Sequence, residues 1–519
     1  MDFNEIRKQS ETILQELRAK CPAELSLLVE SLSMMQGMMF ELGNALIQQN
    51  KQQIEQNERL SASIESLQST IKELRRQLGQ NSNNSSKPPS SDGYRKPKPK
   101  SLREKSGKKP GGQKGHSGVH MSVPHKADKV EQHIPAKCST CPNLSCCIAS
   151  GKVFACGEKR YVVEALVTTM VIEHQSLKAV ACPNGEKKLK GEFPENVKAY
   201  VQYGNSFTVM AGLLSTTGAV SLNRIQTLLR AMFDISLSQG TISSMVERCA
   251  TMVSPVMEQV KEYLKKTDRA NFDETGVRTK GKLYWVHNSS NDKFTYQTIN
   301  KKRGSEGIEA NGIASSFKGI AVHDCWSSYW NFDNIGKHAV CGAHLLRELN
   351  GVIDNEKDHS WAERFKKLLL DMKKSKETAI AKGLKELEKQ ILEKFDRKYD
   401  LIMYLANKEC PPPAPIEKKG RGRIKKEKTR SLIERLVKLK DSVCLFIKDF
   451  AAPFDNNLAE RDLRNIKTKS KVSGCFRSEN GAQNYLTVMS YLGTARKHGI
   501  NSFQALTEAF KGNSQIILG

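Results

Sequence analysis

The sequence predicts a multidomain α+β protein: an α/β core with a helical insertion, preceded by an N-terminal coiled coil, a small cysteine-containing module and a helical domain. Three observations support this prediction. Leucine and isoleucine residues before residue 80 repeat in alternating steps of three and four, a segment of Pro, Gly, Ser and Asn follows, and short aromatic and β-branched runs begin at Arg269. The chain has 519 residues, enough for about three or four domains at roughly 150 residues each.

The chain is strongly basic. It has 82 Lys and Arg residues against 56 Asp and Glu residues, which gives a net charge of +26. An excess of this size indicates a polyanionic partner, because neutralising phosphates releases their condensed counterions. The N-terminus lacks the apolar segment of a secretory signal, and no stretch is apolar enough to cross a membrane. We therefore expect a cytoplasmic, nucleoid-associated protein without a membrane partner, whose 13 cysteines are reduced unless they bind a metal.

Residues 1–80 are predicted to form a helical, coiled-coil dimerisation arm. Extending the leucine register backwards places Leu46 at a d position and Asn50 and Asn57 at a positions, where a buried asparagine fixes register and strand number. The alternative is a single amphipathic helix packed on its own domain. The abrupt change in composition after the helix favours a separate arm and a homodimer or higher oligomer. The seam residues are Leu60, Ile64, Leu67, Ile71, Leu74 and Leu78.

Residues 81–120 are predicted to be a basic, flexible linker. The segment has too few apolar residues to offset the entropy of folding. Between Arg95 and Lys114 there are nine basic residues and one acid, Glu104. The segment is a solvated linker, a basic arm that lies along DNA phosphates, or both. The candidate DNA-binding residues here are Lys96, Lys98, Lys100, Lys108 and Lys109.

Residues 121–198 are predicted to form the small cysteine-containing module. Cys138 and Cys141 are separated by two residues, a spacing that lets both thiolates reach one tetrahedral zinc ion. Cys182 is the candidate third ligand, but Pro-Asn-Gly follows it where a second pair would place another cysteine. The module either binds Zn²⁺ or holds unligated thiols.

Residues 199–266 are predicted to be a helical, helix-turn-helix-like DNA-binding region. Apolar residues recur at helical spacing in SLNRIQTLLRAMF, the pattern breaks at DISLSQG, and Ser238 is suited to cap a second helix. Helix, short turn and helix is the outline of a helix-turn-helix DNA-binding unit. A plain αα-hairpin has the same outline, so both interpretations stay open.

Residues 267–350 are predicted to begin the α/β core. Three short strand-like runs, ANFDE, KLYWVHN and KFTYQTI, are separated by turns. GIAVHD follows as a strand that is apolar on both faces, and HAVCGAH is a further short strand before a helix. Three antiparallel strands followed by α/β units is the order of the RNase H-like fold.

Asp273 and Asp324 are the first two candidate catalytic residues. We expect each to end a strand of this core, where a carboxylate needs a cation or hydrogen-bond donors. Two such carboxylates on neighbouring strands make an oxygen site suited to Mg²⁺, or Mn²⁺ in its place. The alternative is that each caps a turn, as a single Asp usually does. Two strand-end carboxylates in a strongly basic chain favour the metal site.

Residues 351–450 are predicted to be a helical insertion with a basic loop. The charged helical pattern breaks at CPPPAPIEKKGRGRIKKEKTR, which has eight basic residues and one acid between Lys418 and Arg430. The loop is either solvated or grips DNA, and its charge favours contact with DNA. The candidate DNA-binding residues here are Arg421, Arg423, Lys425 and Lys426.

Residues 451–519 are predicted to supply the C-terminal helices of the core and the third acid. Asp455 or Asn456 begins a helix, and Glu460 follows one turn in. At helical spacing Asn456, Glu460 and Arg464 share a face, which would join a metal-binding carboxylate to a guanidinium suited to a DNA phosphate.

Two other downstream acids are less suitable as the third acid. Glu434 is expected on the solvent side of a helix whose leucines share the opposite face. Glu479 falls in the turn-like segment RSENGA. Glu460 therefore remains the candidate.

Several longer motifs follow one another in the chain. They are NSSKPPSSDG with KKPGGQKGH, FDETGVRTKGKLYW, HDCWSSYW, CGAHLLRE, and FDNNLAERDLR through KVSGCFRSENGA. On these motifs, from about Leu60 to near the C-terminus, the sequence resembles the DDE-type transposases of the bacterial insertion-sequence-66 family. The family pattern falls on Asp273, Asp324 and Glu460 as the catalytic acids. The resemblance also implies a leucine-zipper-like N-terminus, a zinc-binding module, recognition of transposon ends and, in many members, small accessory proteins as partners.

The resemblance implies metal-dependent phosphoryl transfer on double-stranded DNA, both transposon ends and target. Water as the nucleophile gives strand cleavage and the freed 3′-hydroxyl gives strand transfer, with two metal ions assisting the nucleophile and the leaving oxygen. His344 and Arg347, in CGAHLLRE, are expected near the two aspartates, where they contact phosphate or serve the fold. The rival functions are a catalytically inactive DNA-binding regulator, which predicts the loss of an acid, and an RNase H-like nuclease, which needs no dimerising arm.

Overall fold

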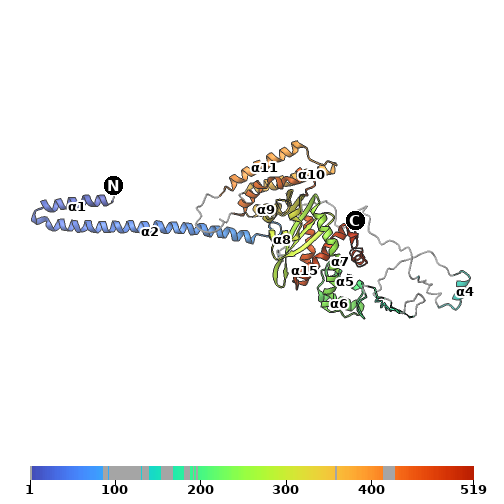
Figure 1. The fold of residues 1–519 in the computed structure, drawn as a ribbon. Coiled ribbons are helices and arrows are strands. Elements are labelled where there is room, and N and C mark those ends of the chain that lie inside the picture. Colours follow the sequence, from blue (N-terminus) through green and yellow to red (C-terminus); the bar gives the residue numbers. More distant parts are fainter. Residues whose placement is uncertain are drawn as a thin grey trace. The chain divides into compact units, whose positions relative to one another are not determined.

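The structure is a computed structural model of the chain. It describes residues 3–85, 92, 130, 140–152, 168–180, 188–190, 192–194, 197–356, 359–412 and 427–519. The chain divides into two compact units, whose elements are labelled in Figure 1. The first unit takes in residues 1–97 with 347–363, and the second takes in residues 98–346 with 364–519.

The first unit begins with a helical hairpin. Helix α1 (Phe3–Lys20) is followed by the short 3₁₀ helix η1 (Ala23–Leu25) and by α2 (Ser26–Leu78), and Figure 1 shows α1 lying back along the first part of α2. Gly43 allows the close approach, because a Cβ there would lie 2.4 Å from Cζ of Phe3. The residue pairs that join the two helices are Phe3 with Phe40, Ser10 with Gln36, and Arg18 with Ser33.

The predicted seam of α2 is exposed beyond the part that α1 covers. Its residues from Leu60 to Leu78 are between 48% and 88% exposed. Within the described part of its own unit, therefore, no helix covers the seam. Helix α2 runs without interruption through this region for a total of 53 residues.

A buried turn follows α2 within the same unit. Asn84 is 5% exposed, and its side-chain Nδ2 donates hydrogen bonds to the carbonyl oxygen of Gly79 at 2.9 Å and to Oδ2 of Asp354 at 3.0 Å. A Cβ on Gly351 would lie 2.6 Å from the Asn84 carbonyl oxygen, so only glycine permits this approach. Described structure thus continues to Ser85, past the predicted start of the linker.

The second unit contains a five-stranded mixed sheet of order β5-β4-β3-β6-β7. Strand β4 pairs antiparallel with β3 and β5, whereas β6 pairs parallel with β3 and β7. The predicted succession of three antiparallel strands and then parallel ones is confirmed, and the GIAVHD strand lies in the interior of the sheet. The strands are β3 (Arg269–Thr279), β4 (Lys282–Ser290), β5 (Thr295–Asn300), β6 (Ile320–His323) and β7 (Lys337–Val340).

The two faces of the sheet pack on different helices. Side chains alternate along a strand, so neighbouring residues of β3 point to opposite faces. Phe272 points into a core that it shares with α7 (Gln239–Lys265), and Val277 points into a core on the other face with α14 (Asn457–Ser473). The remaining elements of this part are α8 (Ser305–Asn311), η3 (Ala314–Ser316), η4 (Ser327–Asn331), α15 (Glu479–Lys497), α16 (Ser502–Phe510) and η5 (Ser514–Leu518). Helix α9 (Gly342–Asn355) begins in this unit, and its residues from Arg347 on belong to the first unit.

Two helices precede α7, namely α5 (Asn205–Ser215) and α6 (Leu222–Phe233). The helix predicted for SLNRIQTLLRAMF is α6, and Ser238 caps α7 by accepting a backbone hydrogen bond on its Oγ, as predicted. The first part of α7 packs on α5 and α6 through residues such as Ile242, and its last part packs in the sheet core through residues such as Val260. The helical region and the sheet are therefore joined by one continuous helix.

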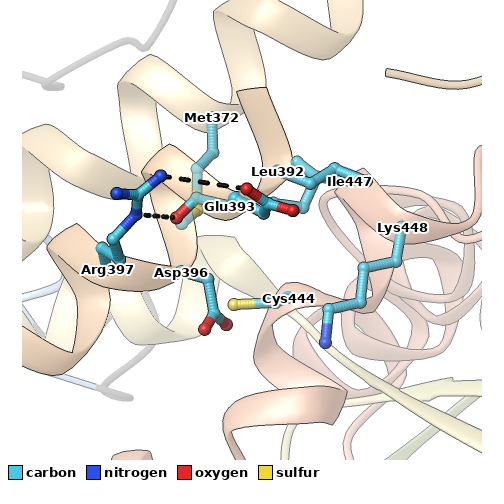
Figure 2. A pocket seen from close by; sticks show the side chains of 8 residues that line it. All are labelled: Met372, Leu392, Glu393, Asp396, Arg397, Cys444, Ile447 and Lys448. Carbon is cyan, nitrogen blue, oxygen red and sulfur yellow. Dashed lines mark hydrogen bonds and ion pairs between the residues drawn. The ribbon is translucent and has the colours of Figure 1, made fainter. Parts of the chain in front are cut away.

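The predicted helical insertion lies between β7 and α14 in the chain. Its helices are α10 (Ser360–Ala381), α11 (Lys389–Glu409), α12 (Lys428–Lys438) and α13 (Lys440–Lys448). A cavity of about 400 Å³ is bordered by α10, α11 and α13. Figure 2 shows the side chains that line it. No predicted site residue lines it, and the lining residues are Met372, Leu392, Glu393, Asp396, Arg397, Cys444, Ile447 and Lys448.

The cysteine module is described in part. The structure has α4 (Leu144–Ala149) and the antiparallel pair β1 (Lys178–Val180) and β2 (Lys188–Lys190). Cys141 is partly buried.

None of the described helices is long and apolar enough to span a membrane. The predicted site residues that lie outside the described residues are Lys96, Lys98, Lys100, Lys108, Lys109, Cys138, Cys182, Arg421, Arg423, Lys425 and Lys426.

Candidate active site

Asp273 and Asp324 lie at matching positions on neighbouring parallel strands. The register pairs Asn271 of β3 with Val322 of β6, and two further residues along each strand bring Asp273 beside Asp324. Asp324 directly follows β6, as predicted. Asp273 does not end its strand, because β3 continues in a long hairpin with β4 to Thr279. It lies instead where β3 passes beyond its pairing with β6.

The backbone after Asp324 is held in an unusual conformation. Oδ1 of Asp324 accepts a hydrogen bond from the backbone N–H of Trp326 at 3.0 Å. Cys325, between these two residues, has a φ of 73°, in the left-handed region. This conformation costs a non-glycine residue about 1–3 kcal/mol, and such strain is concentrated at functional sites. The turn leaves Oδ2 of Asp324 available for other partners.

Glu460 lies in the first turn of α14, on the face of the sheet to which Asp273 points. Its side chain is 25% exposed, and its Oε1 lies 3.9 Å from Nδ1 of His344 near the start of α9. The structure therefore places the third predicted acid on the helix that covers the strand of the first.

A buried asparagine joins the helix of Glu460 to the strand of Asp273. Asn456, directly before α14, is 0% exposed. Its Nδ2 donates to the carbonyl oxygen of Phe272 at 2.7 Å, and its Oδ1 accepts from Nδ2 of Asn271 at 2.8 Å. Both partners directly precede Asp273 in β3. Helical spacing predicts that Asn456 shares a face with Glu460 and Arg464, but Asn456 is the N-cap of α14 and its side chain turns towards β3.

Replacing Asn456 by Ala is expected to lower both stability and activity. The variant leaves the Phe272 carbonyl and the Asn271 amide buried without these partners, and each such loss costs about 1–3 kcal/mol. The free energy of unfolding, measured by chemical denaturation, should fall by the sum of the two losses. A variant at the exposed Lys467 of the same helix, Lys467→Ala, should change it little. Equal stabilities would show that the asparagine does not hold α14.

Burial and neighbouring acids both act on the carboxyl group of Asp273. Burial raises the pKa of Asp273 well above its usual range, and the charges of Glu274, Asp324 and Glu460 raise it further. A hydrogen bond of 2.9 Å from the backbone N–H of Glu274 to Oδ1 of Asp273 acts in the opposite direction. Asp273 is thus a carboxylate whose ionised form needs a cation close by.

The donor set fits a hard divalent cation. Carboxylate oxygens are the ligands that Mg²⁺ and Mn²⁺ prefer, and a cation would relieve the mutual repulsion that raises the pKa of Asp273. Within the described part of the chain, no group of three or more His, Cys, Asp or Glu side chains converges closely enough to hold a metal ion. The three acids are electrostatic neighbours in this structure, and their ligand geometry is not formed.

The remaining predicted residues of the site are placed differently. His344 lies near Glu460, as given above. Arg347, later on the same helix, is grouped with the first unit, and its position relative to the acids is not determined. Arg464 is exposed on α14, one turn beyond Glu460.

The sequence reasoning missed a cluster beside Asp324. The side chain of Glu274 is fully buried on the face of β3 opposite to Asp273. Its carboxylate accepts hydrogen bonds from Nε of Arg303 at 2.9 Å and from the hydroxyl of Tyr329 at 2.9 Å. The signal was present in the alternation of FDETG, because a glutamate that points into a core needs a cation or donors.

Other acids downstream of Asp324 have partners of their own. Asp462 is 5% exposed and forms an ion pair of 2.8 Å with Lys497 of α15. Oδ1 of Asp455 accepts a hydrogen bond of 3.1 Å from the backbone N–H of Asn457, the first residue of α14, although Asn456 and not Asp455 is the N-cap. Glu434 pairs with a residue of its own helix and is not simply solvated, and Glu479 begins α15 and does not lie in a turn.

A sequence model of transposases matches residues 201–484, from just before α5 into the first turns of α15, and covers more than half of the chain. It is the model described as Transposase IS66 family, and this chain belongs to that family. All three predicted acids fall inside the matched residues. A second model, described as a family of unknown function (DUF6444), matches residues 13–122. No curated protein matches the chain.

Proposed function

We propose that this transposase is a DDE enzyme that binds the ends of its insertion sequence and catalyses metal-dependent strand cleavage and strand transfer. Asp273, Asp324 and Glu460 are the catalytic acids. The observation that carries the proposal is geometric: the β3–β6 register brings Asp273 beside Asp324, and Glu460 lies in the first turn of α14, which packs on the same face of β3.

We further propose that the core has the RNase H-like fold. The strand order β5-β4-β3-β6-β7, with three antiparallel strands and then two parallel ones, supports this assignment. So does the position of α14, which packs against the central strand β3. The helical insertion between the second and third acids is consistent with it.

Asp273, Asp324 and Glu460 would hold Mg²⁺, or Mn²⁺ in its place. When bound, such ions activate the attacking oxygen and stabilise the leaving one at the DNA phosphate. The protein's own contribution is position: the buried Asn456 ties α14 to β3, and the strained turn at Cys325 fixes Asp324. His344 is within reach to orient Glu460.

DNA binding rests on the positive charge of the chain. The chain has a net charge of +26, and many of its basic residues lie in two segments, 95–114 and 418–430. Neutralisation of DNA phosphates by such segments gives affinity without sequence preference. The basic residues of the linker and of the insertion loop are the proposed contacts. The helical region from α5 to α7 is the proposed element for recognising transposon ends.

The test is incubation of the purified protein with Mg²⁺ and DNA that carries the terminal repeats of its own element. We expect nicking at the 3′ ends of the repeats and joining of these ends to a second DNA, both abolished by EDTA. Binding of the ends without cleavage would instead indicate an inactive regulator. Cleavage of RNA–DNA hybrids with no preference for the ends would indicate an RNase H-like nuclease.

A further inference from the structure

Arg303 is held rigidly beside the candidate active site. It lies in the short loop between β5 and α8. Its guanidinium stacks on the indole of Trp326, with 3.8 Å from Cζ to the ring centroid, and lies 4.9 Å from the ring centroid of Trp285. Its Nη2 forms an ion pair of 2.8 Å with Oε1 of Glu274. Two aromatic rings and a buried carboxylate thus fix both the plane and the rotation of this guanidinium.

Glu274 is suited to hold Arg303 and not to bind a metal. Its Oε1 is occupied by Arg303, and its Oε2 accepts the hydroxyl of Tyr329. Burial and the charge of Asp324 raise the pKa of Glu274 above its usual range, while Arg303 and Tyr329 act in the opposite direction without reversing the shift. Its carboxylate therefore depends on these two donors and has no oxygen left over.

The guanidinium of Arg303 also lies next to Asp324. Nη2 of Arg303 lies 4.0 Å from Oδ2 of Asp324, the oxygen that the backbone turn leaves available. Nη1 has no hydrogen bond or ion pair to any residue that the structure describes, and the side chain is 32% exposed. An arginine that served only to neutralise Glu274 would have no need of a partly exposed side chain next to Asp324.

The chemistry of this arrangement fits a phosphate. A guanidinium presents donors in a fixed plane that matches phosphate oxygens, and stacking on aromatic rings keeps that plane in place. The rest of the neighbourhood is acidic, so a DNA phosphate brought to these carboxylates meets repulsion unless cations are present. A preorganised arginine is such a cation within the protein.

We propose that Arg303 binds the scissile phosphate of the transposon end, and that Glu274, Trp285 and Trp326 are positioning residues that hold it for this contact. The proposal rests on the proposed function, because it takes Asp324 as part of the catalytic site. It assigns a direct substrate contact to a residue that lies far from the three acids in sequence.

The experiment measures binding of terminal-repeat DNA in Ca²⁺, which is expected to support binding without cleavage. Two duplexes are compared, one natural and one with an uncharged methylphosphonate at the scissile position. Arg303→Gln is expected to weaken binding of the natural duplex on the order of 10- to 100-fold, the loss of a charge-assisted contact. It should weaken binding of the methylphosphonate duplex hardly at all, because the contact is already absent there.

Two variants keep the test independent of folding. Arg303→Lys retains the charge beside Glu274 but lacks the planar fork, and should show a smaller loss that is also confined to the natural duplex. In the double variant Glu274→Gln with Arg303→Gln no buried carboxylate is left without its cation, so its thermal unfolding should stay close to that of the wild type. Like Arg303→Gln, this double variant should bind the natural duplex more weakly than the wild type does, and should bind the methylphosphonate duplex about as well as the wild type does.

The matched control is Lys301→Gln on the same loop. Lys301 is 66% exposed and pairs loosely with Glu479 at 3.8 Å. Lys301→Gln should weaken binding of the natural and the methylphosphonate duplex equally, and only slightly. If Arg303→Gln likewise weakened both duplexes equally, Arg303 would not touch the scissile phosphate and the inference would fail. The proposed function would still be supported in that case if the wild-type protein cleaved terminal-repeat DNA in Mg²⁺.

Discussion

Replacing Glu460 by Gln is expected to lower Mg²⁺-dependent DNA cleavage on the order of 1,000-fold or more, while folding and binding of the ends stay intact. Glutamine has nearly the same shape but neither the charge nor the strength of a carboxylate as a ligand for a hard cation. Glu460 lies in the first turn of α14 with a side chain that is 25% exposed, so the change creates no buried cavity. Single-turnover cleavage of labelled terminal-repeat DNA measures the effect.

The matching changes at the other two acids should act in the same way. Asp273→Asn and Asp324→Asn remove charges that belong to the same cluster. Asp273→Asn also removes the crowding that raises the pKa of Asp273, so this variant should be at least as stable as the wild type. A set of inactive but stable variants separates a catalytic role from a structural one.

The controls are two downstream glutamates with partners elsewhere. Glu434 accepts a hydrogen bond of 3.3 Å from Arg430 on α12, and Glu479 accepts one of 3.2 Å from the hydroxyl of Tyr284. Glu434→Gln and Glu479→Gln keep an acceptor oxygen for these donors and should cleave at near wild-type rates. Near-normal cleavage by Glu460→Gln would remove that residue from the site.

The sequence predicted the elements of the core well because their signals are local. Alternating aromatic and β-branched residues marked β3, β4 and β5, and the Lys280-Gly281 turn joins β3 and β4 with positive φ at both positions, as a tight hairpin requires. The cap of Ser238 on α7 depends on residues three apart. Such signals need no knowledge of distant parts of the chain.

The parts that the sequence missed depend on distant partners. Asn456 has the spacing of an open helix face, yet it is buried because Asn271 and Phe272, some 185 residues earlier, supply its hydrogen bonds. Arg303 carries no local signal at all, since its role follows from where Trp285 and Trp326 lie in space. Pairings of this kind are set by tertiary structure and not by periodicity.

The N-terminal arm shows the same limit in another way. The predicted seam begins at Leu46, and nothing in the sequence indicated that α1 folds back along the part of α2 before it, as far as Gly43. The arm therefore has two parts, a hairpin that packs on itself and a single helix beyond it. No periodicity within α2 marks this boundary, because it depends on the length of α1.

Disrupting the exposed seam of α2 is expected to convert the protein from a dimer into a monomer. Ile64 and Ile71 fall on a positions, and Leu67 and Leu74 on d positions, the combination that favours a parallel two-stranded coiled coil. All four are 48–61% exposed in the single chain. Burial of one such side chain against a second copy contributes about 1.5–3 kcal/mol, so the seam as a whole can hold a dimer.

The variant Leu67→Asp with Ile71→Asp places charges in the middle of the seam and should halve the mass measured by light scattering. Deletion of residues 1–80 should have the same effect. The control variant Ala62→Asp with Ser69→Asp adds the same two charges at f positions of the same heptads, which point away from a partner helix. It should remain a dimer, so that loss of helix propensity alone cannot explain a monomer. A seam variant with unchanged mass would place the contact between copies elsewhere on the chain.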